Sequence, residues 1–201
     1  MVSNMTAAKY KKILEEIMGD PRYQCGVQWG KPRRGHPEAT IQAHILELES
    51  NLAVLEPKLS ELETEKLRLL IHTHDTFKFD AQPGVSVTHP KNHATLASRF
   101  LAEFCKEVDL LNMVQYHDES YAIFRKLKPD GTFDSQRLLE LMAKIRDWDL
   151  FMAFMVIDGC TRGKSAAPVE WIIHKASGLV ETRVDQTWVI RHDKQSSART
   201  G

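Results

Sequence analysis

Apolar residues return every three or four positions along most of the chain, which is the period of an amphipathic α-helix. This spacing predicts helices over residues 7–18, 37–55, 60–74, 90–104, 109–124 and 135–159. Ser60 and Glu63 match a capping box at the start of one helix, and Pro90 suits the first turn of another. We therefore expect an all-α fold made of a single helical bundle.

The helical pattern weakens in two other parts of the chain. Residues 20–38 are rich in glycine, proline and arginine, and we expect them to form a loop. After Gly163 a helix is predicted over 169–176. The runs 179–184 and 187–190 have some strand character and suggest a short β hairpin. The expected segments are an N-terminal helix and loop over 1–34, a helical domain over 35–164, and a C-terminal extension over 165–201 with a disordered tail.

Several histidines and aspartates interrupt the apolar helix faces. His44, for example, follows Ile41 by three residues and precedes Leu48 by four, so it lies on the buried side. Burying one unpaired polar group costs about 1–3 kcal/mol, and burying a lone carboxylate costs more. One such histidine is most often a satisfied core residue, but a set spread over five helices indicates that its members meet around a divalent cation. The set is His44, His74, Asp75, His93, His117 and Asp158.

Composition and charge narrow the classes of partner. Lysine plus arginine total 27, and aspartate plus glutamate total 27, so a broad basic surface for nucleic acid is excluded. Cys25, Cys105 and Cys160 lie far apart, which argues against a disulfide framework and a cysteine zinc site. No signal peptide or membrane-spanning run is visible. We expect a cytoplasmic protein that binds neither nucleic acid nor membrane.

The order of these histidines and aspartates resembles the HD superfamily of metal-dependent phosphohydrolases, in particular the HD domain of bacterial tRNA nucleotidyltransferases. The resemblance covers residues 35–164. Its segments are HPEATIQAH at 36–44, HDTFK at 74–78, HPKNHA at 89–94, YHD at 116–118 and DGCTRG at 158–163. Thr76 and Phe77 stand where many members have an aliphatic residue and glycine. Without a nucleotidyltransferase or GYP segment, we expect neither tRNA end synthesis nor cyclic-di-GMP hydrolysis.

The resemblance implies a metal centre. The ligands of a first ion would be His44, His74, Asp75 and Asp158. Many family members bind a second ion through two more histidines, here His93 and His117, with Asp75 bridging the ions. In a site with one ion, these two histidines would contact the substrate phosphate instead. We therefore expect one or two divalent transition metal ions, and imidazole with carboxylate suits Mn, Fe, Co, Ni or Zn.

The implied chemistry is hydrolysis of a phosphoester by water that the metal activates. Asp75 would serve catalysis as a ligand, and Asp118 is the candidate to orient or deprotonate the water. Lys78 lies one helical turn after His74 and is within reach of the phosphate. An ordinary solvated charge is the alternative role for each lysine or arginine. The substrate-binding candidates are Arg33, Arg34, Lys78 and His89.

The function that these features favour is an enzyme, a metal-dependent phosphohydrolase. Its substrate would be a phosphomonoester or phosphodiester of a small phosphorylated metabolite, preferably a nucleotide. Two alternatives stay open: a non-catalytic HD module that senses a ligand, and a di-iron oxygenase of the HD type, which uses the same order of ligands. The expected partner is the small phosphorylated substrate, and a homodimer also stays open.

Overall fold

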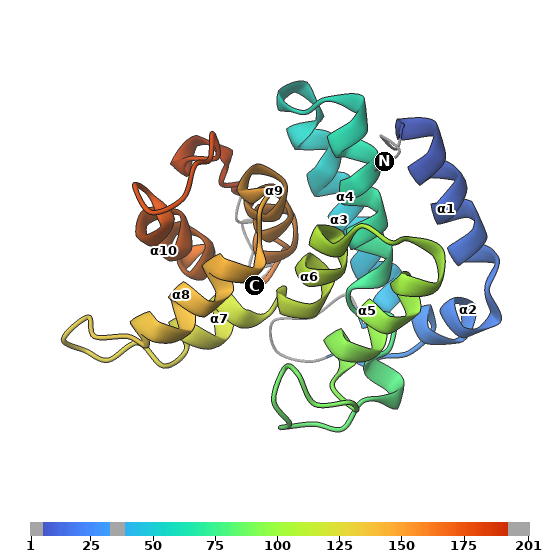
Figure 1. Ribbon diagram of the computed structural model, residues 1–201, viewed down its shortest axis with the longest axis horizontal. Coiled ribbons are helices and arrows are strands. Elements are labelled where there is room, and N and C mark those ends of the chain that lie inside the picture. The colour runs from blue at the N-terminus through green and yellow to red at the C-terminus, as the bar shows by residue number, and fades with distance from the viewer. Residues whose placement is uncertain (1–5, 33–38, 193–201) are drawn as a thin grey trace, which may run out of the picture.

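The computed structural model describes residues 6–32 and 39–192, and these residues form a bundle of helices (Figure 1). The prediction of an all-α fold is confirmed. The α-helices are α1 Ala7–Gly19, α2 Pro21–Val27, α3 Ile41–Leu55, α4 Glu61–Thr73, α5 His93–Phe104, α6 Val108–Tyr116, α7 Glu119–Phe124, α8 Ser135–Lys144, α9 Trp148–Gly159 and α10 Ala167–Ala176. The 3₁₀ helices are η1 Glu56–Lys58, η2 Lys78–Asp80 and η3 Gln186–Trp188.

Helix α4 is the central element of the bundle. It packs against α1, α3, α5, α6 and α9, and Figure 1 shows it between the N-terminal helices and α9. Its side chains Leu69, Leu70 and Ile71 are all fully buried, because neighbours enclose the helix on several sides. Ser60 and Glu63 form the predicted capping box at its start. The other end of α4 therefore lies deep in the protein, where His74 follows.

Helix α9 is apolar on every side. All residues from 150 to 157 are buried, as expected for a helix without a polar face. The side-chain amide of Asn51 in α3 donates hydrogen bonds to the carbonyl oxygens of Ile157 (2.8 Å) and Cys160 (3.3 Å). These bonds tie the end of α9, which carries Asp158, to the helix that carries His44.

The helix predicted over 135–159 is divided into α8 and α9. The carboxylate of Asp109 accepts hydrogen bonds from the backbone N–H groups of Arg146 and Asp147, each at 2.9 Å. The Asp147 side chain then caps α9 by accepting from the N–H of Leu150 at 3.0 Å. In a continuous helix these backbone N–H groups would donate to carbonyl oxygens four residues earlier. Here they donate to side-chain carboxylates, so the helix is interrupted and the chain turns.

Two predictions for the N-terminal half need correction. The loop predicted over 20–38 contains helix α2 (Pro21–Val27), which Asp20 caps with its side chain. A capping aspartate followed by a proline in the first turn is a typical helix start. The loop was predicted from composition, which does not take this order into account. The helix predicted from Pro90 begins later, because Asn92 supplies its cap.

The predicted β hairpin is wrong. The runs 179–184 and 187–190 form no strand in the described structure, and the second run holds part of η3. The carboxylate of Asp149 in α9 accepts the N–H of Arg183 at 2.6 Å, a donor that a hairpin would have used between strands. Trp188 is buried against the helices, so this segment packs by its side chains. The helix predicted over residues 169–176 is confirmed by α10.

One hydrophobic core runs through the described chain. Its buried side chains extend in sequence from Tyr10 to Trp188, so both terminal regions contribute to it. The division into segments 1–34, 35–164 and 165–201 stays a prediction. Among the described helices, none combines the length and the apolar character needed to cross a bilayer.

Helix α2 approaches the chain directly after His74 and Asp75. A Cβ atom placed on Gly26 would lie 2.1 Å from the carbonyl oxygen of Thr76, well inside contact distance. Only glycine permits this backbone approach, because the obstructing atom is itself backbone. Helix α2 therefore supports the segment that carries the His-Asp pair.

We predict that Gly26→Ala lowers the free energy of unfolding by about 1–3 kcal/mol, the usual cost of overpacking a close contact. Gly19→Ala is the matched control, because a Cβ at Gly19 meets no atom within 4 Å. The control should be neutral or stabilise α1 by about 0.5–1 kcal/mol. Urea denaturation of both variants measures the difference, and equal stabilities would contradict the packing described here.

Candidate metal centre

The six predicted ligands lie together where five helices meet. His44 is the fourth residue of α3, and His93 is the first residue of α5. His74 and His117 are the C-terminal cap residues of α4 and α6. Asp158 lies in the last turn of α9. The convergence expected from the buried helix faces is therefore observed, and the role of each residue as a ligand stays a prediction.

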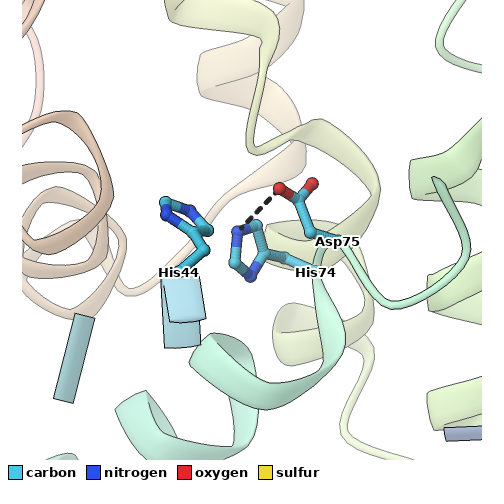
Figure 2. A group of neighbouring side chains, drawn as sticks. All are labelled: His44, His74 and Asp75. Carbon is cyan, nitrogen blue, oxygen red and sulfur yellow. Dashed lines mark ion pairs between the residues drawn. The ribbon is translucent and has the colours of Figure 1, made fainter. Parts of the chain in front are cut away.

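The first group of side chains is His44, His74 and Asp75 (Figure 2). One ligand atom from each lies within 4.8 Å of the others, and all three residues are buried. Nε2 of His74 lies 3.5 Å from Oδ2 of Asp75, the ion pair drawn in Figure 2. Asp158 adjoins this group, because its Oδ1 is 3.0 Å from Nε2 of His44. The group offers imidazole nitrogens and carboxylate oxygens to one point.

The second group is Asp75, His93 and His117, again with ligand atoms within 4.8 Å of one another. Nε2 of His93 and Nε2 of His117 each lie 3.6 Å from Oδ1 of Asp75, and 3.4 Å from each other. The Asp118 carboxylate is 3.3 Å from Nε2 of His93. Asp75 belongs to both groups, so its two oxygens face two adjacent sets of imidazoles.

The orientation of two of these rings follows from the way their helices end. Nδ1 of His74 donates to the carbonyl oxygen of Ile71 at 3.0 Å, and Nδ1 of His117 donates to that of Val114 at 2.8 Å. In a continuous helix each carbonyl would accept the N–H of the residue after the histidine. The imidazole takes that acceptor, which explains why the predicted fourth helix is divided at His117. A carbonyl only accepts, so Nδ1 carries the proton and Nε2 faces the cluster.

The electrostatics of the first group combine a neutral imidazole with ionised carboxylates. Burial lowers the pKa of His74 to about 4, so its ring is neutral near pH 7. Burial alone would raise the pKa of Asp75, but Lys78 and the surrounding imidazoles hold it well below the usual value. Burial acts in the same direction on the pKa of Asp158, and Lys164 with His44 more than offsets it.

The second group carries positive charge next to its carboxylates. Burial would lower the pKa of His117, but the charges of Asp118 and Asp75 outweigh it and raise that pKa to about 9. Desolvation would raise the pKa of Asp118, yet His117 and His93 hold it below the usual value. The Asp118 side chain is 49% exposed, so it faces open space while staying ionised.

The residues of the cluster fit a metal ion. Nε2 of His74 and Oδ1 of Asp75 are buried and have no hydrogen-bond partner within residues 6–32 and 39–192. Each buried polar atom left in this state costs about 1–3 kcal/mol. A cation between them would satisfy both, and the nitrogen and oxygen donor set suits Mn, Fe, Co, Ni or Zn. These buried His/Asp groups can therefore hold a metal ion.

A cavity of about 620 Å³ opens beside the cluster. Asp75, His117, Asp118 and Asp158 are among the residues that line it. Lys78 and Lys164 also line it, and each forms an ion pair with a carboxylate of the cluster. The other lining residues come from α7, from Met155 and Gly159 of α9, and from the chain that leads into and begins α10. The cluster is thus buried but accessible to a small molecule.

The predicted substrate-binding residues are distributed differently. Lys78 pairs with Asp75 and lines the cavity. His89 lies in a turn before α5, where its Nδ1 accepts the N–H of Lys91 at 3.1 Å, and it does not line this cavity. Arg33 and Arg34 lie outside the described residues. A substrate-binding role for each of these residues stays a prediction.

Sequence reasoning missed Lys164. Its Nζ lies 3.0 Å from the Asp158 carboxylate and 3.0 Å from the backbone carbonyl of the same residue. The available signal was a lysine six residues after Asp158, beyond Gly163, whose φ of 83° allows the chain to turn back. A cation in this place also interacts favourably with the C-terminal end of α9.

Comparison with known proteins adds no relative: no family model, curated protein or solved structure matches the chain. The chemistry of the site therefore has to be argued from its own geometry. Its main elements are two buried groups that share Asp75, two lysines and one adjoining cavity.

We predict that a substitution in one group weakens metal binding at that group alone, whereas a substitution of the shared Asp75 affects both. Asp75→Asn removes the shared carboxylate and should abolish stoichiometric binding of Mn or Zn. His44→Ala should weaken only the first site and His93→Ala only the second, each by at least about tenfold, since even groups that merely orient a ligand contribute that much. Elemental analysis after dialysis counts ions per chain.

The matched control is His174→Ala, which should leave the metal content unchanged because His174 is exposed on α10 and belongs neither to the two groups nor to the cavity lining. Thermal unfolding provides a second measurement. An ion at 100 times its Kd stabilises the folded state by about 2.7 kcal/mol, and Asp75→Asn should lose that gain. Full metal occupancy in Asp75→Asn would show that the ligands are wrong.

Proposed function

We propose that this protein is an enzyme of the HD type, a metal-dependent phosphohydrolase that acts on a small phosphorylated metabolite. One observation carries the proposal: two buried His/Asp groups share Asp75 at the edge of a cavity that also presents Lys78 and Lys164. Histidines and carboxylates in this arrangement bind divalent transition metals, and ammonium groups beside them attract an anion. A phosphate group is the anion that makes use of both.

The ligands follow from the two groups. We assign His44, His74, Asp75 and Asp158 to a first ion, and His93 and His117, again with Asp75, to a second. When bound, such an ion supplies Lewis acidity toward a phosphoryl oxygen and toward water. Nδ1 of His74 and Nδ1 of His117 stay hydrogen-bonded to backbone carbonyls, which holds Nε2 of each ring in position.

The lysines are suited to bind the phosphate. Both are paired with carboxylates that would serve as ligands, so their ammonium groups already lie at the border between cluster and cavity. A phosphate entering the cavity meets Lys78 from the side of α4 and Lys164 from the side of α9. Charge-assisted hydrogen bonds from both would fix the phosphorus near the cluster.

Asp118 is suited to orient the attacking water. Its half-exposed carboxylate borders both the imidazoles and the cavity. Because the imidazoles lower its pKa, it holds a proton poorly near pH 7 and acts as a hydrogen-bond acceptor. We therefore assign Asp118 an orienting role and leave net proton removal to the solvent.

The cavity volume limits the size of the substrate. About 620 Å³ lies within the usual range for sites that bind small molecules, and it exceeds the needs of inorganic phosphate alone. A nucleotide is therefore the preferred candidate among phosphorylated metabolites.

We predict phosphate release from nucleoside mono-, di- or triphosphates or from phosphodiesters, measured with purified protein and Mn or Co. Asp75→Asn should reduce the rate to background, while His174→Ala should keep it. Absence of hydrolysis above background on every class would contradict the proposal. Tight phosphate binding without turnover would favour a ligand-sensing module instead. Two irons per chain with substrate-dependent oxygen consumption would favour an oxygenase.

We predict that Lys164→Ala lowers kcat/KM by about 10- to 100-fold, the value of one charge-assisted hydrogen bond. Lys164→Arg should restore most of the loss, since it returns the positive charge. Lys144→Ala, an exposed lysine on α8, is the matched control and should be neutral. Metal content measured in parallel separates the roles: if Lys164→Ala loses its metal together with activity, Lys164 supports Asp158 and does not bind phosphate.

A further inference from the structure

Part of the cavity lining is aromatic and apolar. Helix α7 contributes Tyr121 and Phe124, and the start of α10 contributes Pro168 and Val169. Apart from Arg125 on α7, the charged residues of the cavity belong to the His/Asp cluster or are the two lysines paired with it. A ligand that fills the cavity must therefore be anionic at one end and able to pack on apolar surface at the other.

Tyr121 lines this cavity and is an exposed aromatic residue. The residue is 49% exposed, although it lines a cavity next to the cluster. The guanidinium of Arg125, one helical turn later, lies 5.8 Å from the centre of the Tyr121 ring. Arg125 also lines the cavity and makes no ion pair within the described part of the chain. An aromatic ring and an uncommitted guanidinium plane are both surfaces on which a flat ring stacks.

The helix that carries these two residues is held in place by contacts with α8 and α10. Glu119, at the start of α7, is 7% exposed and accepts two hydrogen bonds from Arg137 in α8, at 2.6 and 2.7 Å. Phe124 packs edge-on against Trp171 in α10, with ring centres 5.9 Å apart. Neither anchor involves Tyr121 or Arg125. Other residues thus hold α7 in place, and Tyr121 and Arg125 are not needed for its position.

From this arrangement we infer that the cavity selects a phosphate monoester that carries a planar aromatic group, with Tyr121 and Arg125 as the residues that determine this specificity. The inference rests on the proposed phosphohydrolase function and adds the part of the substrate that the cavity recognises and the residues that recognise it. The phosphate end would lie between Lys78 and Lys164, and the ring would stack on the wall formed by α7. A purely aliphatic phosphate would reach the cluster but leave the Tyr121 ring exposed to water.

Hydrolysis of adenosine 5′-monophosphate, cytidine 5′-monophosphate and ribose 5-phosphate tests the inference. These substrates share a phosphate on the same primary oxygen of ribose and differ in the aromatic base. We expect kcat/KM for the nucleotides to exceed that for ribose 5-phosphate by about 5- to 100-fold, the usual gain from stacking a base on an aromatic side chain. Calorimetric titration with the same compounds measures binding independently of turnover.

Variants assign the preference to its residues. Tyr121→Ala and Arg125→Ala should each lower the ratio of nucleotide to ribose 5-phosphate kcat/KM toward one, whereas Tyr121→Phe should retain it. Leu139→Ala and Lys126→Ala are matched controls, because both side chains are exposed and lie outside the cavity lining. Thermal unfolding confirms that each variant is folded, which the exposure of Tyr121 and Arg125 leads us to expect.

Each outcome separates the inference from the proposed function. A preference for nucleotides that Tyr121→Ala removes and the controls keep supports both. Hydrolysis without preference, or with a preference that neither Tyr121→Ala nor Arg125→Ala alters, overturns the inference and leaves the phosphohydrolase standing. Binding that depends on the base and on Tyr121 without any hydrolysis supports the inference and contradicts the proposed function. If neither hydrolysis nor base-dependent binding is observed, both the inference and the proposed function are overturned.

Discussion

Burial of the Asp75 carboxylate is the constraint on which the rest of the structure depends. Its residue is 3% exposed, and an ionised carboxylate without partners at that depth would cost several kcal/mol. Three imidazoles, from His74, His93 and His117, surround it, and Lys78 pairs with it. These groups come from the ends of α4, α5 and α6 and from η2, so none of these elements can move away without leaving the charge unsatisfied. The side chains that could hold a cation are therefore also the ones that stabilise the buried charge where these helices pack together.

At several helix ends, one side chain both ends the helix and positions a group of the cluster. At His74 and His117 one side chain ends the helix, because its Nδ1–H occupies a carbonyl that the next backbone N–H would need. That bond also fixes the plane of the ring and leaves Nε2 for the cluster. Asn51 acts similarly across helices, since its amide closes the end of α9 at the position where Asp158 is required. The same side-chain hydrogen bonds thus end these helices and set the geometry of the site.

The apolar period predicted the buried faces well, because burial of leucine and isoleucine on one face is a local property of a helix. It revealed His44 and Asp158 as polar residues on such faces, and the two do meet. The period could not predict the division after His117, because the backbone of His117 and Asp118 stays in the helical region and only a side chain competes for one carbonyl. The hairpin failed for a tertiary reason. Strand-like composition near 183 is overruled by Asp149, which is distant in sequence but adjacent in the fold.

Lys164 was missed for a related reason, since a turn at Gly163 brings it back to Asp158 and no periodicity reports such a return. The cavity that results is divided by chemistry. The charged side is tied into the core through Asp75 and cannot change without loss of the cluster. Tyr121 stands on α7, which Glu119 fixes to α8 through Arg137 and Phe124 fixes to α10 through Trp171. Substitutions at Tyr121 would therefore alter which ring the cavity accepts without disturbing the groups that hold a metal, so specificity and chemistry can vary independently in this fold.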